Sequence, residues 1–497
     1  MGEVVPIEDD STQEPLQIIT VRSSSIKETP GVTACNNSDG CTTTSQRSGQ
    51  GISLRELESW LPITESRNGN TFSATCHLLC SGIGYQALLL PVAFAALGWA
   101  WGIICLSIAF MWQLYTIWLL VNLHEPVPGT RYSRLVRLSI FAFGQKLGKL
   151  VAIFPAMYLS GGYCVLLIIT GGGTMEKLFK IFCREGTSCE SKSLTGTEWF
   201  LIFTCAALII GQLPNLNSIA RVSLIGAIAA IGYCTLIWVL SISKGRLNAV
   251  SYSRPNDAET GMTGFGNILN AIGIIMLAFK GHNLILEIQG TLPSTSSSNH
   301  PSRKSMWRGV MVSYIIIATC LFPLAIAGFW AYGNKIPANG GILTAFSQFH
   351  RQDTSKFVIG LIYLLLIISC LSSYQIYAMP VFDNLQFIYV TIKKRRCPGW
   401  VRAGLRLFFG GFTFFIAVAF PFLGSLAPVV GGMAAVPLTF AYPCFMWISI
   451  KRPRANGAMW SLNLGLGCFG IVLSILLVVA AVWNLADKGL NANFFRP

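Results

Sequence analysis

The chain carries eleven long apolar runs, and this feature limits its possible folds more than any other. An α-helix rises about 1.5 Å per residue, so about 20 apolar residues cross the ~30 Å hydrocarbon layer of a bilayer. The runs lie at roughly residues 74–97, 99–122, 150–181, 198–213, 219–243, 262–292, 308–331, 356–388, 403–422, 425–449 and 458–484. The pattern predicts an all-α polytopic membrane protein.

Composition agrees with a membrane protein. Hydrophobic residues make up 53% of the chain and charged residues only 11%, which is too few for a soluble globular domain. The net charge of +15 comes from short basic groups between the apolar runs, without a basic domain. We therefore expect the lipid bilayer as a partner and no nucleic acid. The few titratable residues inside the runs form no set of nucleophile, base and orienter, so we expect no enzyme activity.

Most of the 15 cysteines lie inside apolar runs, where cysteine behaves as a small hydrophobe. No zinc-type spacing occurs, so no metal site is expected. Cys183 and Cys189 are an exception because they share one polar loop. They either form a disulfide or remain two free thiols.

The loops predict how the chain crosses the membrane. Residues 1–71 are rich in Ser, Thr and acidic groups, and we expect them to form a disordered cytosolic N-terminal tail. With this tail in the cytoplasm, the strongly basic loops after the second, sixth, eighth and tenth runs all fall on the cytoplasmic side. An odd number of crossings then places the short C-terminal tail, residues 485–497, outside the cell.

The runs divide into two halves of similar length. Residues 72–243 hold the first five runs and residues 262–449 hold the next five. An odd number of crossings per half means that the halves are inverted relative to each other. The sequence therefore predicts an inverted five-plus-five helix repeat, with residues 458–484 as an eleventh transmembrane helix.

The sixth run is interrupted in its middle. Its apolar pattern ends at Phe279, and the residues that follow are Lys280, Gly281 and His282. The run then resumes with Glu287 inside it. Charge at membrane depth is tolerated only where it faces protein or a watery cavity. We therefore predict a broken helix whose loose ends line a solute site.

The first run contains a similar stretch. Its mid-membrane residues are polar or glycine-rich: Gly82, Ile83, Gly84, Tyr85 and Gln86. Either this helix is broken too, or the glycines only let two helices approach closely. We prefer the broken helix, because the corresponding helix of the second half is also interrupted.

Several segments carry a resemblance to a known family. They read LPVAFAALGWAWG (90–102), LYTIWLLVNLHEPVPGTRYSRL (114–135), FGQKLGK (143–149), GHNLILEIQGTLPS (281–294), YQIYAMPVFDNL (374–385) and VPLTFAYPC (436–444). Over about residues 72–450 the chain resembles the plant amino acid/auxin permease family, and within it the lysine-histidine transporter-like group. The resemblance implies the inverted five-plus-five fold with an eleventh helix. It also implies proton-driven uptake of amino acids across the plasma membrane, with no cofactor besides the proton gradient.

The chain departs from the family pattern at both interruptions. Members typically have G-A-G in the first helix, where this chain has Gly84, Tyr85 and Gln86. They typically have an alanine before the Gly-His pair of the sixth helix, where this chain has Lys280. These departures bring side chains into the region expected to hold the solute.

A zwitterionic amino acid needs donors for its carboxylate and acceptors for its ammonium group. We expect backbone amides around Gly82–Tyr85 to supply the donors, and carbonyl groups around Phe279–Gly281 to supply the acceptors. Selectivity would then depend on the side chains of Tyr85, Gln86 and Lys280.

Lys280 has three interpretations that the sequence leaves open. It pairs with a substrate anion, it replaces a bound coupling cation, or it neutralises Glu287. The first interpretation would favour acidic amino acids or another carboxylate.

Proton coupling requires a titratable group. Glu287 is the best candidate, because a buried carboxyl group can load and release protons near neutral pH. Its alternative role is a fixed hydrogen-bond acceptor near the cytoplasmic mouth. His282 either takes part in coupling or is a packing residue.

The remaining candidates lie in the third and eighth runs. The wall opposite the two breaks is expected to be formed by Tyr158, Gly161, Gly162 and Tyr163, although ordinary helix packing explains the glycines equally well. Ser372 and Ser373 resemble the hydroxyl pair that holds a sodium ion in sodium-coupled relatives, or they bond their own helix backbone. Asp383 is expected to anchor the cytoplasmic end of its helix.

The sequence therefore predicts a proton-coupled secondary active transporter that imports amino acids by alternating access at the plasma membrane. One alternative is a carrier of auxin-like or other organic anions. Another is a sensor that binds amino acids without moving them.

Overall fold

The computed structural model describes residues 58–488 except 128, 184–193, 214, 254–260, 294–300, 339, 423–427 and 430, and it also describes residues 494–495. The described residues belong to one compact unit, Ile52–Pro497, and form helices and no β-strand. The helices are α2 (Thr71–Gly82), η1 (Tyr85–Leu89), α3 (Leu90–Leu123), α4 (Leu135–Phe143), α5 (Gln145–Phe182), α6 (Gly196–Ile210), α7 (Ala220–Lys244), α8 (Gly261–Ala278), η2 (His282–Leu284), α9 (Ile285–Gly290), α10 (Pro301–Tyr332), η3 (Gly333–Lys335), α11 (Gly341–His350), α12 (Lys356–Lys393), α13 (Gly399–Ala419), the π-helical η4 (Gly431–Ala435) and η5 (Pro437–Ala441), α15 (Tyr442–Lys451) and α16 (Ala458–Lys488).

Each predicted apolar run overlaps helix among the described residues. Within the described residues, nine helices are long and apolar enough to cross a bilayer. One of them, Tyr85–Leu123, contains the second run and part of the first, and the fourth run forms the shorter apolar helix Gly196–Ile210. An all-helical membrane protein is therefore confirmed. The inverted five-plus-five repeat with its eleventh helix stays a prediction.

The first two runs are separated by a single glycine. Gly98 has φ 77° and ψ 177° inside α3, a backbone conformation that residues with a Cβ rarely adopt. The predicted runs end at residue 97 and begin at residue 99, so the chain reverses direction where the sequence pattern pauses. Nothing lies within 4 Å of a Cβ placed on Gly98, so the backbone conformation alone requires glycine here.

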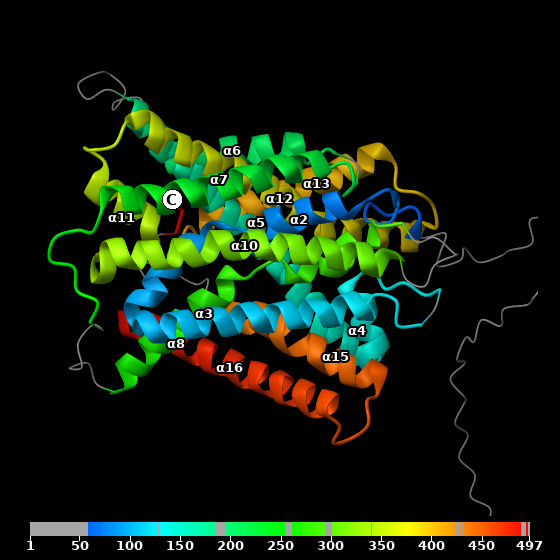
Figure 1. Cartoon of the computed structure of the whole chain (residues 1–497). Helices are drawn as coiled ribbons and strands as arrows, with labels where there is room; N and C mark the ends of the chain where they lie inside the picture. Colours follow the sequence, from blue (N-terminus) through cyan, green and yellow to red (C-terminus); the bar gives the residue numbers. More distant parts are fainter. Residues whose placement is uncertain are drawn as a thin grey trace, which may run out of the picture. The chain divides into compact units, whose positions relative to one another are not determined.

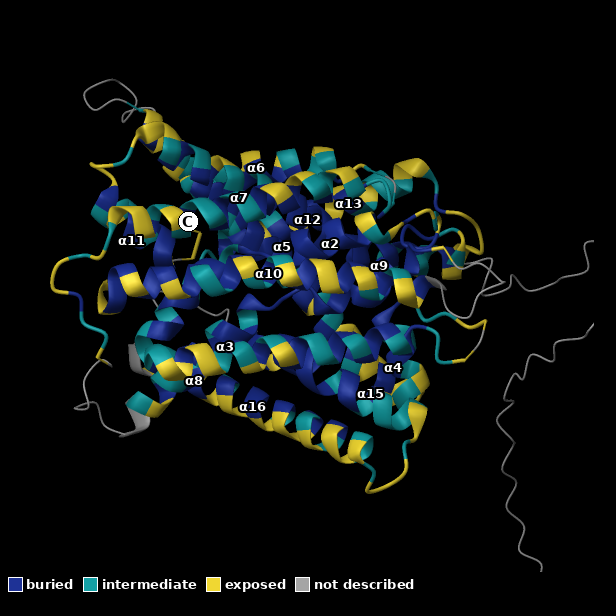
Figure 2. Cartoon of the chain, viewed as in Figure 1, coloured by how far each residue is buried: buried dark blue, intermediate teal, exposed yellow. Residues whose placement is uncertain are grey.

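The core lies around the central helices. Helix α12 packs against both α5 and α7, and α2 packs against α7, α10 and α12 (Figure 1). Figure 2 shows buried residues concentrated on α2, α5 and α12, whereas α16 and the outer side of α10 carry exposed residues. Many of the exposed residues are large and apolar, including Phe408 and Phe412 on α13, as expected of surfaces in contact with lipid.

The basic loops gather at one end of the bundle, as the charge pattern predicts. Arg134, between α3 and α4, contacts Asp383 of α12 with Nε–Oδ2 at 2.5 Å and Nη2–Oδ1 at 3.1 Å. Arg303 at the start of α10 and Lys451 at the end of α15 line one cavity there. We call this end of the bundle the basic end. That it faces the cytoplasm stays a prediction.

The predicted disordered tail, residues 1–71, needs a correction at its end. Residues 1–57 lie outside the described part of the chain, but residues 58–70 are packed against the bundle. Leu61 and Ile63 are 0% and 1% exposed. The backbone N–H of Ile63 donates to Asp383 Oδ1 at 3.3 Å, and the N–H of Gly69 donates to the carbonyl of Thr291 at 3.1 Å. We call residues 58–70 the entry segment.

Candidate functional site

The first predicted break is confirmed. Helix α2 ends at Gly82, and Ile83 and Gly84 are extended, with φ/ψ of −92°/111° and −129°/175°. The chain then continues into η1, a short 3-10 helix that begins at Tyr85. This leaves backbone groups on both sides of the break without their usual helical partners.

The second predicted break is confirmed as well. Helix α8 ends at Ala278, and helical structure resumes only at His282. Gly281 between them has φ 90°, in the left-handed region that favours glycine. Phe279, Lys280 and Gly281 are all buried, although one of them carries a charge.

The two breaks lie against each other. A Cβ placed on Gly281 would lie 2.9 Å from Ser81 Oγ, at the end of α2. A Cβ placed on Gly84 would overlap with the ammonium group of Lys280 and lie 2.8 Å from Gln86 Oε1. The Lys280 side chain therefore reaches across from the second break and rests on bare backbone at the first.

Helix α12 closes the end of α2 with hydroxyl groups. Ser373 Oγ donates to the carbonyl of Cys80 at 2.9 Å, and the Tyr377 hydroxyl donates to the carbonyl of Ser81 at 2.8 Å. Ser373 thus bonds α2 and not its own helix, while Ser372 packs with its Cβ against Gly226 of α7. The role of the two serines in an ion site stays a prediction. Tyr377 is not among the site residues predicted from the sequence, although it lies one helical turn beyond Ser373 and therefore on the same face of α12.

Lys280 lies beside two aromatic rings. Its Nζ is 5.5 Å from the ring centre of Tyr163 and 5.3 Å from that of Tyr377. The residue is 5% exposed, and within the described chain Nζ has neither a hydrogen-bond partner nor an ion-pair partner. The interpretation that Lys280 neutralises Glu287 is therefore wrong in this structure. Burial of an unpaired ammonium group costs free energy, and a bound anion would reduce that cost.

Two further polar side chains near the breaks are buried without partners in the described structure. These are Gln86, through Oε1, and His282, through both ring nitrogens. His282 is 2% exposed, so it packs in the interior, but its ring nitrogens have no partner among the described residues; its part in coupling stays a prediction. Its neighbour Asn283 is satisfied, because Nδ2 donates to Ser160 Oγ of α5 at 3.2 Å.

The wall formed by α5 agrees with the predicted one at Tyr163 but not at Tyr158. Tyr158 is 36% exposed and stacks on Phe154, with ring centres 5.2 Å apart, so the structure does not bring it to the breaks. A Cβ on Gly162 would have no neighbour within 4 Å. Tyr163 is the α5 residue that contacts Lys280, and its ring lies 4.8 Å from that of Tyr377. Tyr85 also faces α5 and bonds Thr170.

Glu287 lies in α9, between the second break and the basic end. It is 7% exposed, and its charged neighbours are Asp383 and Arg134. Arg134 also lies 3.7 Å from Glu58 of the entry segment and donates to Thr64 Oγ1 at 3.3 Å. Glu58 in turn contacts Arg67, at 3.9 Å, and Arg137. Asp383 therefore anchors more than the end of α12, because it joins that helix to the entry segment through Arg134.

Arg131 ties the basic end to the end of α9. Its Nη2 donates to the carbonyl of Gln289 at 3.3 Å and to that of Leu292 at 3.0 Å. Burial lowers the pKa of Arg131 to about 10, so the group keeps its charge at pH 7. Helix α9 thus begins at the second break and ends in contacts that close the basic end.

At the opposite end of the bundle, aromatic side chains pack against one another. Trp99 lies 4.7 Å and Tyr252 5.4 Å from Phe329, measured between ring centres. Phe329 is near the end of α10, whereas the start of α10 is at the basic end. The breaks lie between these two contact regions.

The predictions on metal binding and on a disulfide concern other parts of the chain. Among the described residues, no three His, Cys, Asp or Glu side chains gather as a metal ion would require. The pairing of Cys183 with Cys189 lies outside the described residues, because Cys189 is not among them.

The chain is similar to known proteins in sequence and in fold. A sequence model of the family described as transmembrane amino acid transporter protein matches residues 67–486. Two Arabidopsis thaliana proteins are similar over 89% of this chain: lysine histidine transporter-like 8 (50% identical, 84% of that protein covered) and lysine histidine transporter-like 7 (52% identical, 90% covered). Among solved structures, the substrate-bound outward-open state of a Na⁺-coupled sialic acid symporter matches with a TM-score of 0.54 at 13% identity. That match covers 88% of this chain and 93% of the symporter, and it concerns the fold alone.

Proposed function

Because the chain belongs to the transmembrane amino acid transporter protein family, we propose that it imports amino acids by alternating access, driven by a proton gradient. The substrate site lies where the α2–η1 and α8–η2 breaks meet. One observation carries this proposal: two broken helices present bare backbone and a buried, unpaired ammonium group to the same small space.

The substrate carboxylate pairs with Lys280 in this proposal. An ammonium group that is buried without an anion raises the energy of the empty site, and a bound carboxylate removes that cost. Carbonyl groups freed at the end of α8 accept from the substrate ammonium, since helix C-termini attract cations. The rings of Tyr163 and Tyr377, with centres 4.8 Å apart, lie together on one side of the Lys280 ammonium group and restrict where the carboxylate sits.

Glu287 is the proposed proton carrier. It lies on α9 next to the pair formed by Arg134 and Asp383, which joins α12 to the entry segment. Gain or loss of a proton on Glu287 changes the charge beside that pair. This location would couple proton binding to opening at the basic end.

Uptake of radiolabelled solute into proteoliposomes tests the proposal. The proteinogenic amino acids and indole acetate are each supplied at two external pH values, with the internal pH held constant. We expect amino acids to accumulate more when the outside is more acidic. Binding of an amino acid without any uptake would instead make the protein a sensor and would contradict the proposal.

The Glu287→Gln variant tests proton coupling separately. We expect it to equilibrate the substrate across the membrane but to lose accumulation driven by the pH gradient, because the amide cannot carry the proton. Glu176→Gln is the matched control, since Glu176 lies near the surface and pairs with Lys180 one helical turn away. Full pH-driven accumulation in the Glu287→Gln variant would end the candidacy of Glu287.

A second candidate function is transport of organic anions that lack an amino group. The observation that favours it is again Lys280, because its ammonium group could meet a carboxylate without help from a substrate ammonium group. Competition separates the two functions. An amino acid carrier is inhibited weakly by simple carboxylates such as indole acetate, whereas an anion carrier is inhibited by them as strongly as by amino acids.

A further inference from the structure

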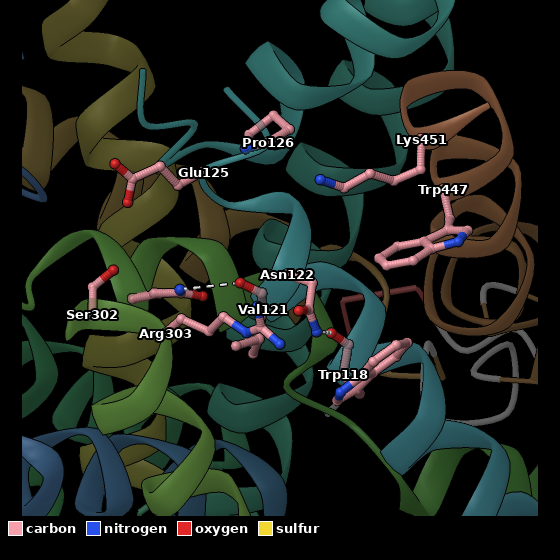
Figure 3. Close-up of a pocket in the computed structure, with 10 residues that line it drawn as sticks. Trp118, Val121, Asn122, Glu125, Pro126, Ser302, Arg303, Trp447 and Lys451 are labelled. Atoms are coloured by element: carbon pink, nitrogen blue, oxygen red, sulfur yellow. Dashed lines mark hydrogen bonds between the residues drawn. The ribbon is translucent and has the colours of Figure 1, made fainter. Parts of the chain in front are cut away.

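A cavity of about 370 Å³ lies at the basic end, apart from the two breaks. It is formed by the end of α3, the start of α10, the end of α15 and Gln289 of α9 (Figure 3). Its volume is within the range of small-ligand sites. The transport cycle proposed above gives this cavity no role.

The side chains around the cavity favour an anion. Arg303 from α10 and Lys451 from α15 reach it from different helices (Figure 3), and neither has an ion-pair partner among the described residues. Glu125 also lines the cavity, but its carboxylate is directed away from Lys451 (Figure 3). That carboxylate accepts from the backbone N–H of Gly129 at 3.4 Å and interacts with Arg131. Two cations from different helices therefore face the cavity, and the carboxylate of Glu125, which also lines it, interacts with Gly129 and Arg131.

Buried polar atoms add specific contacts. Gln289 is 1% exposed; its Nε2 donates to the carbonyl of Val121 at 3.2 Å, which leaves Oε1 without a partner in the described chain. Ser302 is also 1% exposed, and its Oγ has no partner among the described residues. A ligand with anionic oxygens and hydroxyl groups would satisfy both atoms, because the serine can donate and the glutamine oxygen can accept.

An apolar surface leads away from the cavity. Trp118 and Trp447 line the cavity, and their ring centres are 5.3 Å apart. Tryptophan is enriched at membrane interfaces. Met111 precedes Trp118 by two helical turns on α3 and is 62% exposed. Ile108 and Ile104 continue this exposed apolar side of α3, at 55% and 45%. A molecule with an anionic head and an apolar tail matches both parts.

We propose that the cavity binds the headgroup of an anionic phospholipid. The lipid phosphate lies between Arg303 and Lys451, headgroup oxygens meet Ser302 and Gln289, and the acyl chains follow the exposed side of α3 past Met111. The bound lipid touches Gln289 at the end of α9, a helix that begins at the proposed substrate site. Phosphate is the shared chemistry of a lipid and a soluble phosphate ester, and the apolar side of α3 favours the lipid.

Thermal unfolding of the full chain in vesicles tests the proposal. One set of vesicles contains phosphatidylcholine alone, and the other contains an added fraction of phosphatidylinositol phosphate. The test variant is Arg303→Gln with Lys451→Gln. The matched control is Lys304→Gln with Arg454→Gln, which removes the same charge from exposed residues that do not line the cavity.

We expect the anionic lipid to raise the unfolding temperature of the wild type and of the control. In the cavity variant the lipid raises the unfolding temperature much less, because loss of the two side chains that hold the phosphate weakens lipid binding about tenfold or more. Equal unfolding temperatures of all three proteins in phosphatidylcholine show that the substitutions leave the fold intact.

Three results would overturn the proposal. The cavity variant could keep the full lipid effect, or the control could lose as much as the cavity variant, which would indicate general attraction to a charged surface. Glycerophosphoinositol phosphate or inorganic phosphate, added to the phosphatidylcholine vesicles, could also stabilise the wild type as much as the lipid does. That last result would assign the cavity to a soluble anion.

Discussion

The two helix breaks differ in how well their polar groups are satisfied. At the first break, the last carbonyl groups of α2 accept hydrogen bonds from Ser373 and Tyr377. At the second break, Lys280 and His282 are buried with side-chain nitrogens that have no partner in the described structure. The end of α2 is therefore held in place, although Gln86 Oε1 beyond it has no partner among the described residues. Under the proposed function, the second break is where a bound solute changes the energy most.

The free-energy contributions at the second break are also expected to be larger than those at the first. A typical hydrogen bond contributes about 0.5–1.5 kcal/mol to stability, so each hydroxyl that closes α2 has a modest and constant effect. A buried charge without a partner is destabilising by several kcal/mol. The largest uncompensated term thus lies at Lys280.

Replacement of Lys280 by Met should have the largest effect. The apolar side chain keeps most of the length but removes the charge, so the free energy of unfolding of the empty protein rises by about 1–3 kcal/mol. Substrate affinity falls about 30-fold or more, because the carboxylate loses a buried partner. Thermal unfolding and uptake kinetics measure the two quantities, and Lys180→Met, at an exposed ion pair, is the control. Unchanged stability together with an unchanged substrate profile would remove the contrast between the breaks.

The Gly84→Ala variant should have a smaller effect that depends on Lys280. The new methyl group overlaps with the ammonium group of Lys280, which must move away from the first break. Loss of uptake and of stability should shrink when Lys280→Ala is also present, with a coupling energy of about 1–3 kcal/mol in a double-mutant cycle. Gly161→Ala on α5 is the control, because its methyl group would have no neighbour within 4 Å. Simple additivity of Gly84→Ala and Lys280→Ala would show that the two breaks act independently.

The Ser373→Ala variant should have the smallest effect. It removes the hydrogen bond to the carbonyl of Cys80, which destabilises the protein by about 0.5–1.5 kcal/mol while the substrate profile stays the same. Ser372→Ala, at the neighbouring residue that packs on Gly226, should unfold close to the wild-type temperature. A changed substrate or cation dependence in the Ser373→Ala variant would give the first break a direct part in binding.

Much of the fold could be predicted because the signals are local. Apolar length predicts the helices, and glycine next to polar residues at mid-membrane predicts the breaks near Gly84 and Gly281. The basic loops predict which helix ends meet. Each of these features depends on residues that are close together in the sequence.

The partners across the site could not be predicted in the same way. Tyr158 and Tyr163 are five residues apart, which turns them about 140° from each other around a helix. In a soluble protein the polar face would show which of the two points inward. Helix α5 is apolar toward both lipid and protein, so the sequence does not reveal which face is buried.

The entry segment illustrates the same limit. Its composition favours disorder, but Leu61 and Ile63 are buried because Glu58 contacts Arg134 and Arg137 at the start of α4, and the backbone N–H of Ile63 donates to Asp383. The contacts of Tyr377 and Ser373 with α2 likewise join residues nearly 300 positions apart. Such pairings exist only in the folded chain.

Helix α9 contains only six residues, so it is about 9 Å long at 1.5 Å per residue. One end follows Gly281, and the carbonyl groups at the other end are held by Arg131 and Gly69. A rod this short turns a small tilt into little displacement at its far end, whereas a shift along its own axis is passed on in full. If substrate binds at the breaks as proposed, a shift of α9 along its axis, more than a tilt, is therefore expected to carry its effect to the contacts at the basic end.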